Sequence, residues 1–136
     1  MLQSLLTLDA GITTGYSYWI RHELQDSGGV PYDREAQAFV GVPETLWYKN
    51  IELVVMELTK PWIGQLSADL QHVQQIWAGM FPDLVTVQPW QWKPSHSKAP
   101  LPKKCSSTHE RDAIRMGLWV IKHETSNTPL PFRRTL

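Results

Sequence analysis

The pattern of apolar and polar residues predicts three strands within the first 42 positions of the chain. An apolar run from Leu5 is closed by the acid Asp9, as at the end of a strand. Between Tyr16 and Arg21, apolar and polar side chains alternate with the period of two that is typical of a strand. The polar stretch from Gln25 to Asp33 contains glycines and a proline and predicts a hairpin turn or a loop, and Ala36 to Val42 predicts the third strand.

Helices and strands are expected to alternate after this point. Pro43 and Glu44 favour a short helical segment over 45–50. Leu53 to Met56 is nearly all apolar, as in a central strand that is covered on both faces. Apolar residues then recur at spacings of three and four, and they predict one buried helix face: Leu66, Leu70, Val73, Trp77 and Met80.

A strand from Leu84 to Gln88 and a helix from about His109 to Lys122 complete the predicted elements. The stretch from Pro94 to Thr108 is rich in Pro, Ser and Lys, and we expect it to form a loop. The order β-β-β-α-β-α-β-α predicts an α/β fold, with a mixed five-stranded sheet flanked by helices. We expect one domain over residues 1–123 and a polar tail over 124–136.

Composition narrows the class of protein. A length of 136 residues favours one domain with a core of its own. The single cysteine, Cys105, excludes an internal disulfide and fits a reducing compartment. No apolar stretch approaches the roughly 20 residues of a membrane helix, and no signal peptide is evident. We therefore expect a cytoplasmic protein that does not contact the membrane.

Charge is distributed unevenly along the chain. Residues 1–84 carry 4 Lys and Arg against 10 Asp and Glu, whereas residues 85–136 carry 9 against 3. A basic segment on an acidic body suggests an anionic partner such as nucleic acid. The alternative is a solvated surface of uneven charge, because net charge alone does not report function.

Seven tryptophans are many for this length. Trp90 and Trp92 lie beside Lys93, so they could stack on bases or sugars, although packing in the core or at its rim is the favoured interpretation. Packing is also expected for Trp62, Trp77 and Trp119.

Four residues from distant parts of the chain predict one metal site. Asp9 and Glu57 close apolar strands, while His109 and Asp112 are three residues apart near the start of the last helix and share one face of it. Each has an ordinary alternative: a turn for Asp9, an exposed strand end for Glu57 and helix capping for the other two. Such hard donors suit Mg²⁺ or Mn²⁺, and two ions about 4 Å apart would serve phosphodiester hydrolysis.

Four motifs in order give the chain a family resemblance over residues 4–122. The segment 8–15 resembles a first-strand motif Asp-Pro-Gly-x-x-x-x-Gly, with Ala10 in place of the proline, and 54–57 resembles the strand that supplies a second acid. The segment 89–93 resembles a fifth-strand motif that ends in a lysine. The segment 109–113 resembles a final-helix motif in which a carboxylate or His is followed three residues later by Asp-Ala. The chain is similar to the RuvC-like Holliday-junction resolvases of the RNase H-like superfamily, and in size to short phage-type members.

The resemblance implies an RNase H-like fold and a divalent-metal-dependent DNA endonuclease that cleaves Holliday junctions or other branched DNA. Asp9, Glu57 and Asp112 would hold two Mg²⁺ or Mn²⁺ ions, with His109 as a further ligand or a proton carrier. Phosphate contacts would come from four lysines: Lys93, Lys98, Lys103 and Lys104. A homodimer in the cytoplasm of a bacterial or phage-infected host cell is the expected setting.

The chain departs from the family over residues 94–108, where a proline-rich, lysine-bearing stretch replaces a Gly-rich turn and a helix. This departure favours a nuclease that accepts several kinds of branched DNA rather than four-way junctions alone. Two alternatives stay open. One is a catalytically weak or inactive nucleic-acid-binding protein of the same fold. The other is nucleotide binding of the actin-like kinase type, whose first phosphate loop resembles 9–15, although those proteins need a second domain.

Overall fold

The computed structural model describes residues 2–47, 50–58, 67–126 and 128–129. Its strands form one mixed sheet in the order β4-β3-β2-β1-β5-β6. The strands are β1 (Ser4–Asp9), β2 (Thr13–Ile20), β3 (Glu23–Asp33), β4 (Ala38–Phe39), β5 (Leu53–Glu57) and β6 (Val85–Val87). The helices are the 3-10 turn η1 (Glu44–Leu46), α1 (Ala68–Met80), α2 (Pro89–His96) and α3 (Thr108–Thr125).

Strand β1 lies inside the sheet, at the point where antiparallel pairing gives way to parallel pairing. It pairs antiparallel with β2 and parallel with β5, and β5 pairs parallel with β6. In this register Asp9 lies opposite Glu57. The two acids that close separate apolar runs in the sequence therefore end neighbouring strands at the same edge of the sheet.

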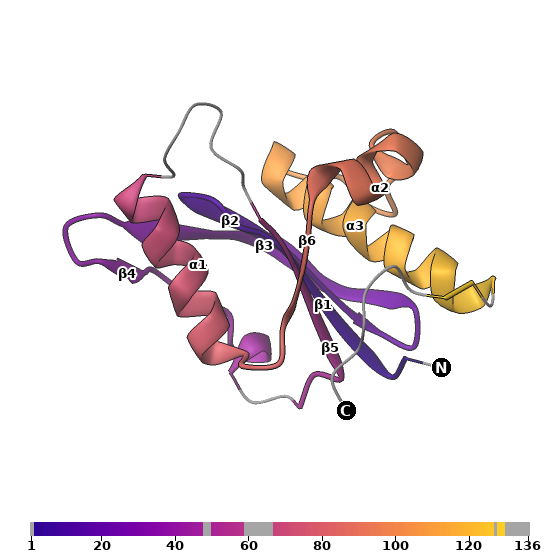
Figure 1. Ribbon diagram of the computed structural model, residues 1–136, viewed down its shortest axis with the longest axis horizontal. Coiled ribbons are helices and arrows are strands. Elements are labelled where there is room, and N and C mark those ends of the chain that lie inside the picture. The colour runs from indigo at the N-terminus through magenta and orange to yellow at the C-terminus, as the bar shows by residue number, and fades with distance from the viewer. Residues whose placement is uncertain (1, 48–49, 59–66, 127, 130–136) are drawn as a thin grey trace.

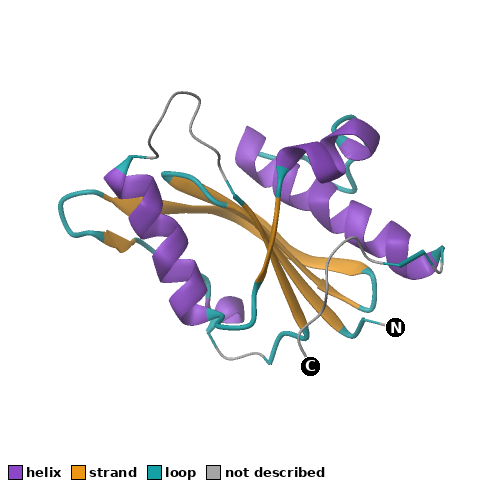
Figure 2. Cartoon of the chain, viewed as in Figure 1, coloured by secondary structure: helices purple, strands orange, loops and turns teal. Residues whose placement is uncertain are grey.

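Helices cover the two faces of the sheet, with α1 on one face and α2 and α3 on the other (Figures 1 and 2). Successive side chains of a strand point to opposite faces. Accordingly Leu6 and Leu8 of β1 belong to the core cluster that includes Trp77 of α1, whereas Leu5 belongs to the cluster that includes Ile114 of α3. Positions of odd number in β1 and β5 thus face α2 and α3.

The mixed α/β architecture agrees with the sequence prediction, but within the described residues the sheet has six strands rather than five. The predicted turn or loop over residues 25–33 was wrong, because β3 spans this stretch. The predicted third strand over 36–42 reduces to the two residues of β4. A two-residue turn, Arg21-His22, joins β2 to β3 with positive φ angles of 49° and 68°. Tight hairpins usually place Gly or Asn at such positions, so the sequence carried no turn signal here.

A second difference lies after β6. The segment 89–93 was expected to continue a strand motif, but Pro89 begins helix α2, and Lys93 lies on that helix. Proline suits a first helical position because no N–H is needed there. The Gln91 side chain accepts a hydrogen bond from the Gln88 N–H at 2.8 Å and caps the same turn. The predicted loop over 94–108 is thereby shortened to the stretch 97–107.

The other predicted helices are observed with shifted ends. Helix α1 begins at Ala68 after the cap Ser67 and buries Val73 and Trp77; Leu66 lies outside the described residues. Helix α3 continues to Thr125, past the expected boundary between residues 123 and 124. Within the described part of the chain, no helix is long and apolar enough to cross a membrane. Trp62 and positions 130–136 of the expected tail also lie outside it.

Candidate functional site

Two carboxylates lie side by side at the ends of the central parallel strands. Asp9 of β1 and Glu57 of β5 are partners in the strand register and only 6% and 4% exposed. Both occupy odd positions, so both face α2 and α3 rather than α1. Burying two neighbouring carboxylates is costly unless protons or cations compensate their charge.

Helix α3 brings two more of the predicted residues to this point. His109 Nδ1 donates to Asp9 Oδ2 across 2.9 Å. Asp112, one turn further along the helix, lines a pocket together with His109 and Asp9. The side chains of these two residues share a helix face because they are three positions apart, as the sequence indicated.

Buried hydroxyls hold α3 against the sheet just beside Asp112. The hydroxyl groups of Thr7 and Ser17 donate to the carbonyl oxygen of Ala113 at 2.6 and 3.0 Å, and they contact each other. The indole N–H of Trp19 donates to Ser17 Oγ at 2.7 Å. A buried hydroxyl group that lacks a hydrogen bond costs free energy. This network therefore fixes the position of α3 relative to β1 and β2.

Helix α2 contributes the remaining groups. The Trp92 indole N–H donates to Glu57 Oε1 at 3.0 Å. Lys93 Nζ lies 3.8 Å from the same oxygen and 3.9 Å from Asp112 Oδ2. Together β1, β5, α2 and α3 form a pocket of about 340 Å³, which is lined by Asp9, Glu57, Pro89, Lys93, Thr108, His109 and Asp112.

The pocket gathers three carboxyl groups beside one ammonium and one imidazole group. Burial, followed by the hydrogen bond and charge of Asp9, raises the pKa of Glu57 to about 8, although Lys93 and Trp92 act in the opposite direction. Burial and the charge of Asp9 raise the pKa of Asp112 as well. The hydrogen bond to Asp9 raises the pKa of His109 against the effect of burial. Burial is the largest cause for Glu57 and Asp112, but in all three residues the neighbouring carboxylates add to the shift and favour the protonated form.

The donor chemistry fits a hard divalent cation. Three carboxylates and one imidazole, without cysteine, are ligands that Mg²⁺ and Mn²⁺ accept. A cation at Asp9 and Glu57 would also replace the proton that the raised pKa of Glu57 keeps there. As the side chains stand, no three His, Cys, Asp or Glu within the described residues are grouped around one ion position. Asp9 is hydrogen-bonded to His109 instead, and Lys93 approaches Glu57 and Asp112.

Of the four predicted phosphate-binding lysines, only Lys93 lines this pocket. Lys103 Nζ forms an ion pair with Glu110 Oε2 at 3.1 Å. Lys98 and Lys104 are exposed on the stretch that joins α2 to α3. The structure therefore separates one lysine within the site from three on the neighbouring surface.

Sequence reasoning missed Glu110, which is buried beside His109. Its carboxylate accepts from Ser27 Oγ at 2.6 Å and from the Ser106 N–H at 2.9 Å, in addition to its ion pair with Lys103. Burial opposes ionisation, but these donors outweigh it and lower the pKa of Glu110 to about 2. The spacing of Glu110 to the buried residues Ala113 and Gly117 places it on the inner helix face, which was the available signal.

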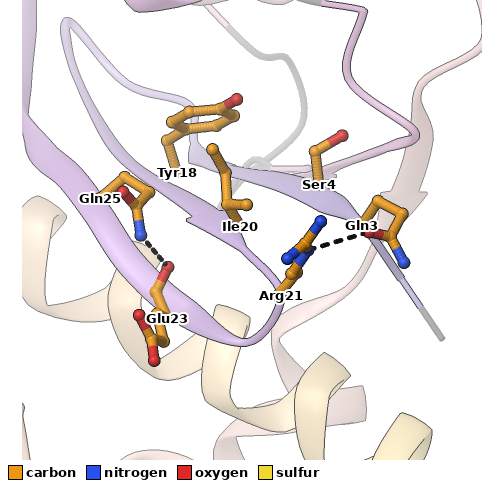
Figure 3. A pocket seen from close by; sticks show the side chains of 7 residues that line it. All are labelled: Gln3, Ser4, Tyr18, Ile20, Arg21, Glu23 and Gln25. Carbon is orange, nitrogen blue, oxygen red and sulfur yellow. Dashed lines mark hydrogen bonds between the residues drawn. The ribbon is translucent and has the colours of Figure 1, made fainter.

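Trp92 was also missed as part of the site, although its expected packing is confirmed. It is fully buried, whereas Trp90, two residues earlier, is 69% exposed. A separate hollow of about 580 Å³ lies at the opposite end of β1 and β2 (Figure 3). There Arg21 Nε donates to Gln3 Oε1 at 3.3 Å, and no residue of the site described above takes part.

Comparisons with known proteins support the fold. Neither family models nor curated protein sequences give a match. Among solved structures, Thermus thermophilus RuvC in complex with a Holliday-junction substrate aligns with a TM-score of 0.67 and 14% identity, over 96% of this chain and 99% of that one. A second structure of Thermus thermophilus RuvC aligns with a TM-score of 0.64 and 15% identity, over 95% and 99%. The chain therefore has a RuvC-like, RNase H-like fold, as the motifs predicted.

Proposed function

We propose that this protein is a divalent-metal-dependent DNA endonuclease that hydrolyses phosphodiesters in Holliday junctions or other branched DNA. The observation that carries the proposal is the convergence of Asp9, Glu57, His109 and Asp112 on one pocket at the edge of a RuvC-like sheet. These residues come from three separate elements, so their meeting is not a product of sequence proximity. Branched DNA is proposed because a structural neighbour is bound to a Holliday junction.

Asp9, Glu57 and Asp112 would hold two Mg²⁺ or Mn²⁺ ions. Ions held there would supply an activated water and would stabilise the leaving oxygen of a phosphodiester. Glu57 and Asp9 offer their charge from the ends of rigid strands, and Asp112 offers it from a helix that buried hydroxyl groups hold in place. Such support keeps ligands within the narrow tolerance that catalysis requires.

His109 and Lys93 would serve the reacting DNA directly. Asp9 orients the imidazole through Nδ1. Nε2 makes no hydrogen bond within the described residues, and it can carry a proton to or from the phosphodiester. Lys93 would offset the charge of the scissile phosphate, and the exposed Lys98 and Lys104 would contact flanking phosphates. A junction presents two strands for cleavage, so we propose a two-fold homodimer.

A second candidate is a nucleic-acid-binding protein of the same fold that cleaves weakly or not at all. One observation favours it: no ready-made set of three ligands is present among the described side chains. Lys93 near Glu57 and Asp112 would then neutralise the acids permanently. Cleavage assays separate the two candidates.

The test is incubation of the purified protein with a synthetic four-way junction and with a linear duplex, each with Mg²⁺, Mn²⁺ or EDTA. We expect nicking of the junction with either metal and none with EDTA. Asp9→Asn should lower the rate at least 100-fold while junction binding persists. Asp83→Asn, an exposed acid in the turn between α1 and β6, is the control and should cleave normally. Unchanged cleavage by Asp9→Asn would overturn the assignment, and binding without cleavage under every metal would favour the second candidate.

A further inference from the structure

A buried indole reaches one of the candidate ligands. The Trp92 N–H donates to Glu57 Oε1 at 3.0 Å, and both residues are buried, with exposed fractions of 0% and 4%. A buried carboxylate oxygen gains more from such a bond than an exposed one, because water does not compete for it. The contact therefore bears on how Glu57 presents itself to the pocket.

Trp92 is a fixed donor, in contrast to Lys93. Its ring belongs to the core cluster that includes Val55, Ile114 and Met116, and close packing leaves such a ring one orientation. The ammonium of Lys93 lies further from Glu57, at 3.8 Å, on a flexible side chain that is 42% exposed. The indole therefore holds Glu57 Oε1 in place whichever conformation the lysine adopts.

We propose that Trp92 is a positioning residue, whose N–H fixes the Glu57 carboxylate so that the pocket binds a divalent cation. This inference rests on the proposed function and goes beyond it, because it assigns a role in cation binding to a core tryptophan of α2. The residue would act through Glu57 and would touch neither metal nor DNA. Residues that hydrogen-bond a metal ligand without touching the metal typically contribute 10–100-fold to metal affinity.

The chain supplies a matched control in Trp77 of α1. Trp77 is equally buried, and its N–H donates to Thr14 Oγ1 at the same distance of 3.0 Å. Its ring lies in the cluster on the opposite face of the sheet, away from Glu57. Trp77→Phe therefore removes the same volume and one buried hydrogen bond, and Trp77 is not among the residues that line the pocket.

The experiment measures Mn²⁺ affinity of the full chain by calorimetry and by the paramagnetic signal of free Mn²⁺, for wild type, Trp92→Phe and Trp77→Phe. We expect Trp92→Phe to weaken Mn²⁺ binding about tenfold or more, and Trp77→Phe to bind like wild type. Melting temperatures should fall to a similar extent in both variants. Equal Mn²⁺ affinity of the two variants overturns the inference. If Trp92→Phe does not fold, Trp92→Met replaces it, since Met fills irregular core space and also lacks a donor.

A double-mutant cycle distinguishes a role through Glu57 from a purely structural role of Trp92. Because Trp92 acts through Glu57, Trp92→Phe should cause little further loss of Mn²⁺ affinity in a Glu57→Gln background. Full additivity of the two substitutions overturns the inference. Failure of the proposed function is recognised separately, since wild type would then bind Mn²⁺ no better than Asp9→Asn and would leave junctions intact.

Discussion

Gly15 of β2 lies directly against the backbone of His109 at the start of α3. A Cβ atom on Gly15 would overlap with the carbonyl group of His109 and with the N–H of Glu110. Backbone cannot move aside as a flexible side chain can, so the helix reaches Asp9 only because residue 15 has no side chain. The glycine that ends the first-strand motif in the sequence thus also sets the position of a helix.

Gly15→Ala should therefore damage both stability and cleavage. Overpacking of this kind typically costs about 1–3 kcal/mol, and the displaced first turn of α3 would carry His109 away from Asp9. Thermal unfolding and junction cleavage are the measurements. Gly79→Ala in α1 is the control, because a Cβ there meets open space and alanine favours a helix. Normal cleavage by Gly15→Ala would show that the position of His109 is not critical.

Lysines on the connection between α2 and α3 should differ in their effects on DNA binding. Lys104 is exposed, so Lys104→Gln should weaken binding and reduce the slope of log affinity against log salt by about one. Lys103 is paired with Glu110, so Lys103→Gln should change this slope less and lower stability by under about 1 kcal/mol. Affinity measured across a salt series decides between them. Equal slopes for both variants would mean that the ion pair opens when DNA binds.

Trp92 is buried in the core, whereas Trp90 is exposed and is free to stack on DNA bases. Within the described residues, its ring makes no aromatic contact and its N–H has no hydrogen-bond partner, and its neighbours Pro89 and Lys93 line the pocket. Trp90→Ala should leave stability within about 0.5 kcal/mol and weaken binding to junctions by about 1–3 kcal/mol. Trp47, which is 59% exposed and lines a different hollow, provides the control variant Trp47→Ala. If Trp90→Ala binds junctions with unaltered affinity, Trp90 does not stack on DNA and only packs at the rim of the core.

His96 should make the fold sensitive to mild acid. Its side chain is only 8% exposed, and burial, then the charges of Lys122 and His123, lower its pKa. The neutral form is favoured in the folded state, so its contribution to stability is full above the unfolded value of about 6.5 and is lost as the pH falls below it. Denaturant midpoints between pH 7.5 and 5 should decline less for His96→Gln than for wild type. Parallel curves for the two proteins would exclude this residue as the cause.

Strand β3 illustrates why part of the fold escaped prediction. Its residues include Gly28, Gly29 and Pro31, which individually disfavour strands, yet β3 pairs along most of its length with β2. Gly28 packs against the ring of Tyr16, where a larger residue would crowd it. Pairing with a neighbouring strand overrode local preference, and that neighbour is visible only once the Arg21-His22 turn is known.

The sequence by itself determined the alternation of buried positions, the strand ends at Asp9 and Glu57, and the shared helix face of His109 and Asp112. These features depend on periods of two and 3.6 residues, which are local properties of the chain. Only the tertiary structure decided that Trp92 donates to Glu57, that Glu110 holds Lys103, and that α2 rather than a strand carries Lys93. Those contacts join residues up to 35 positions apart or depend on how a helix docks, and close packing of the whole core selects them.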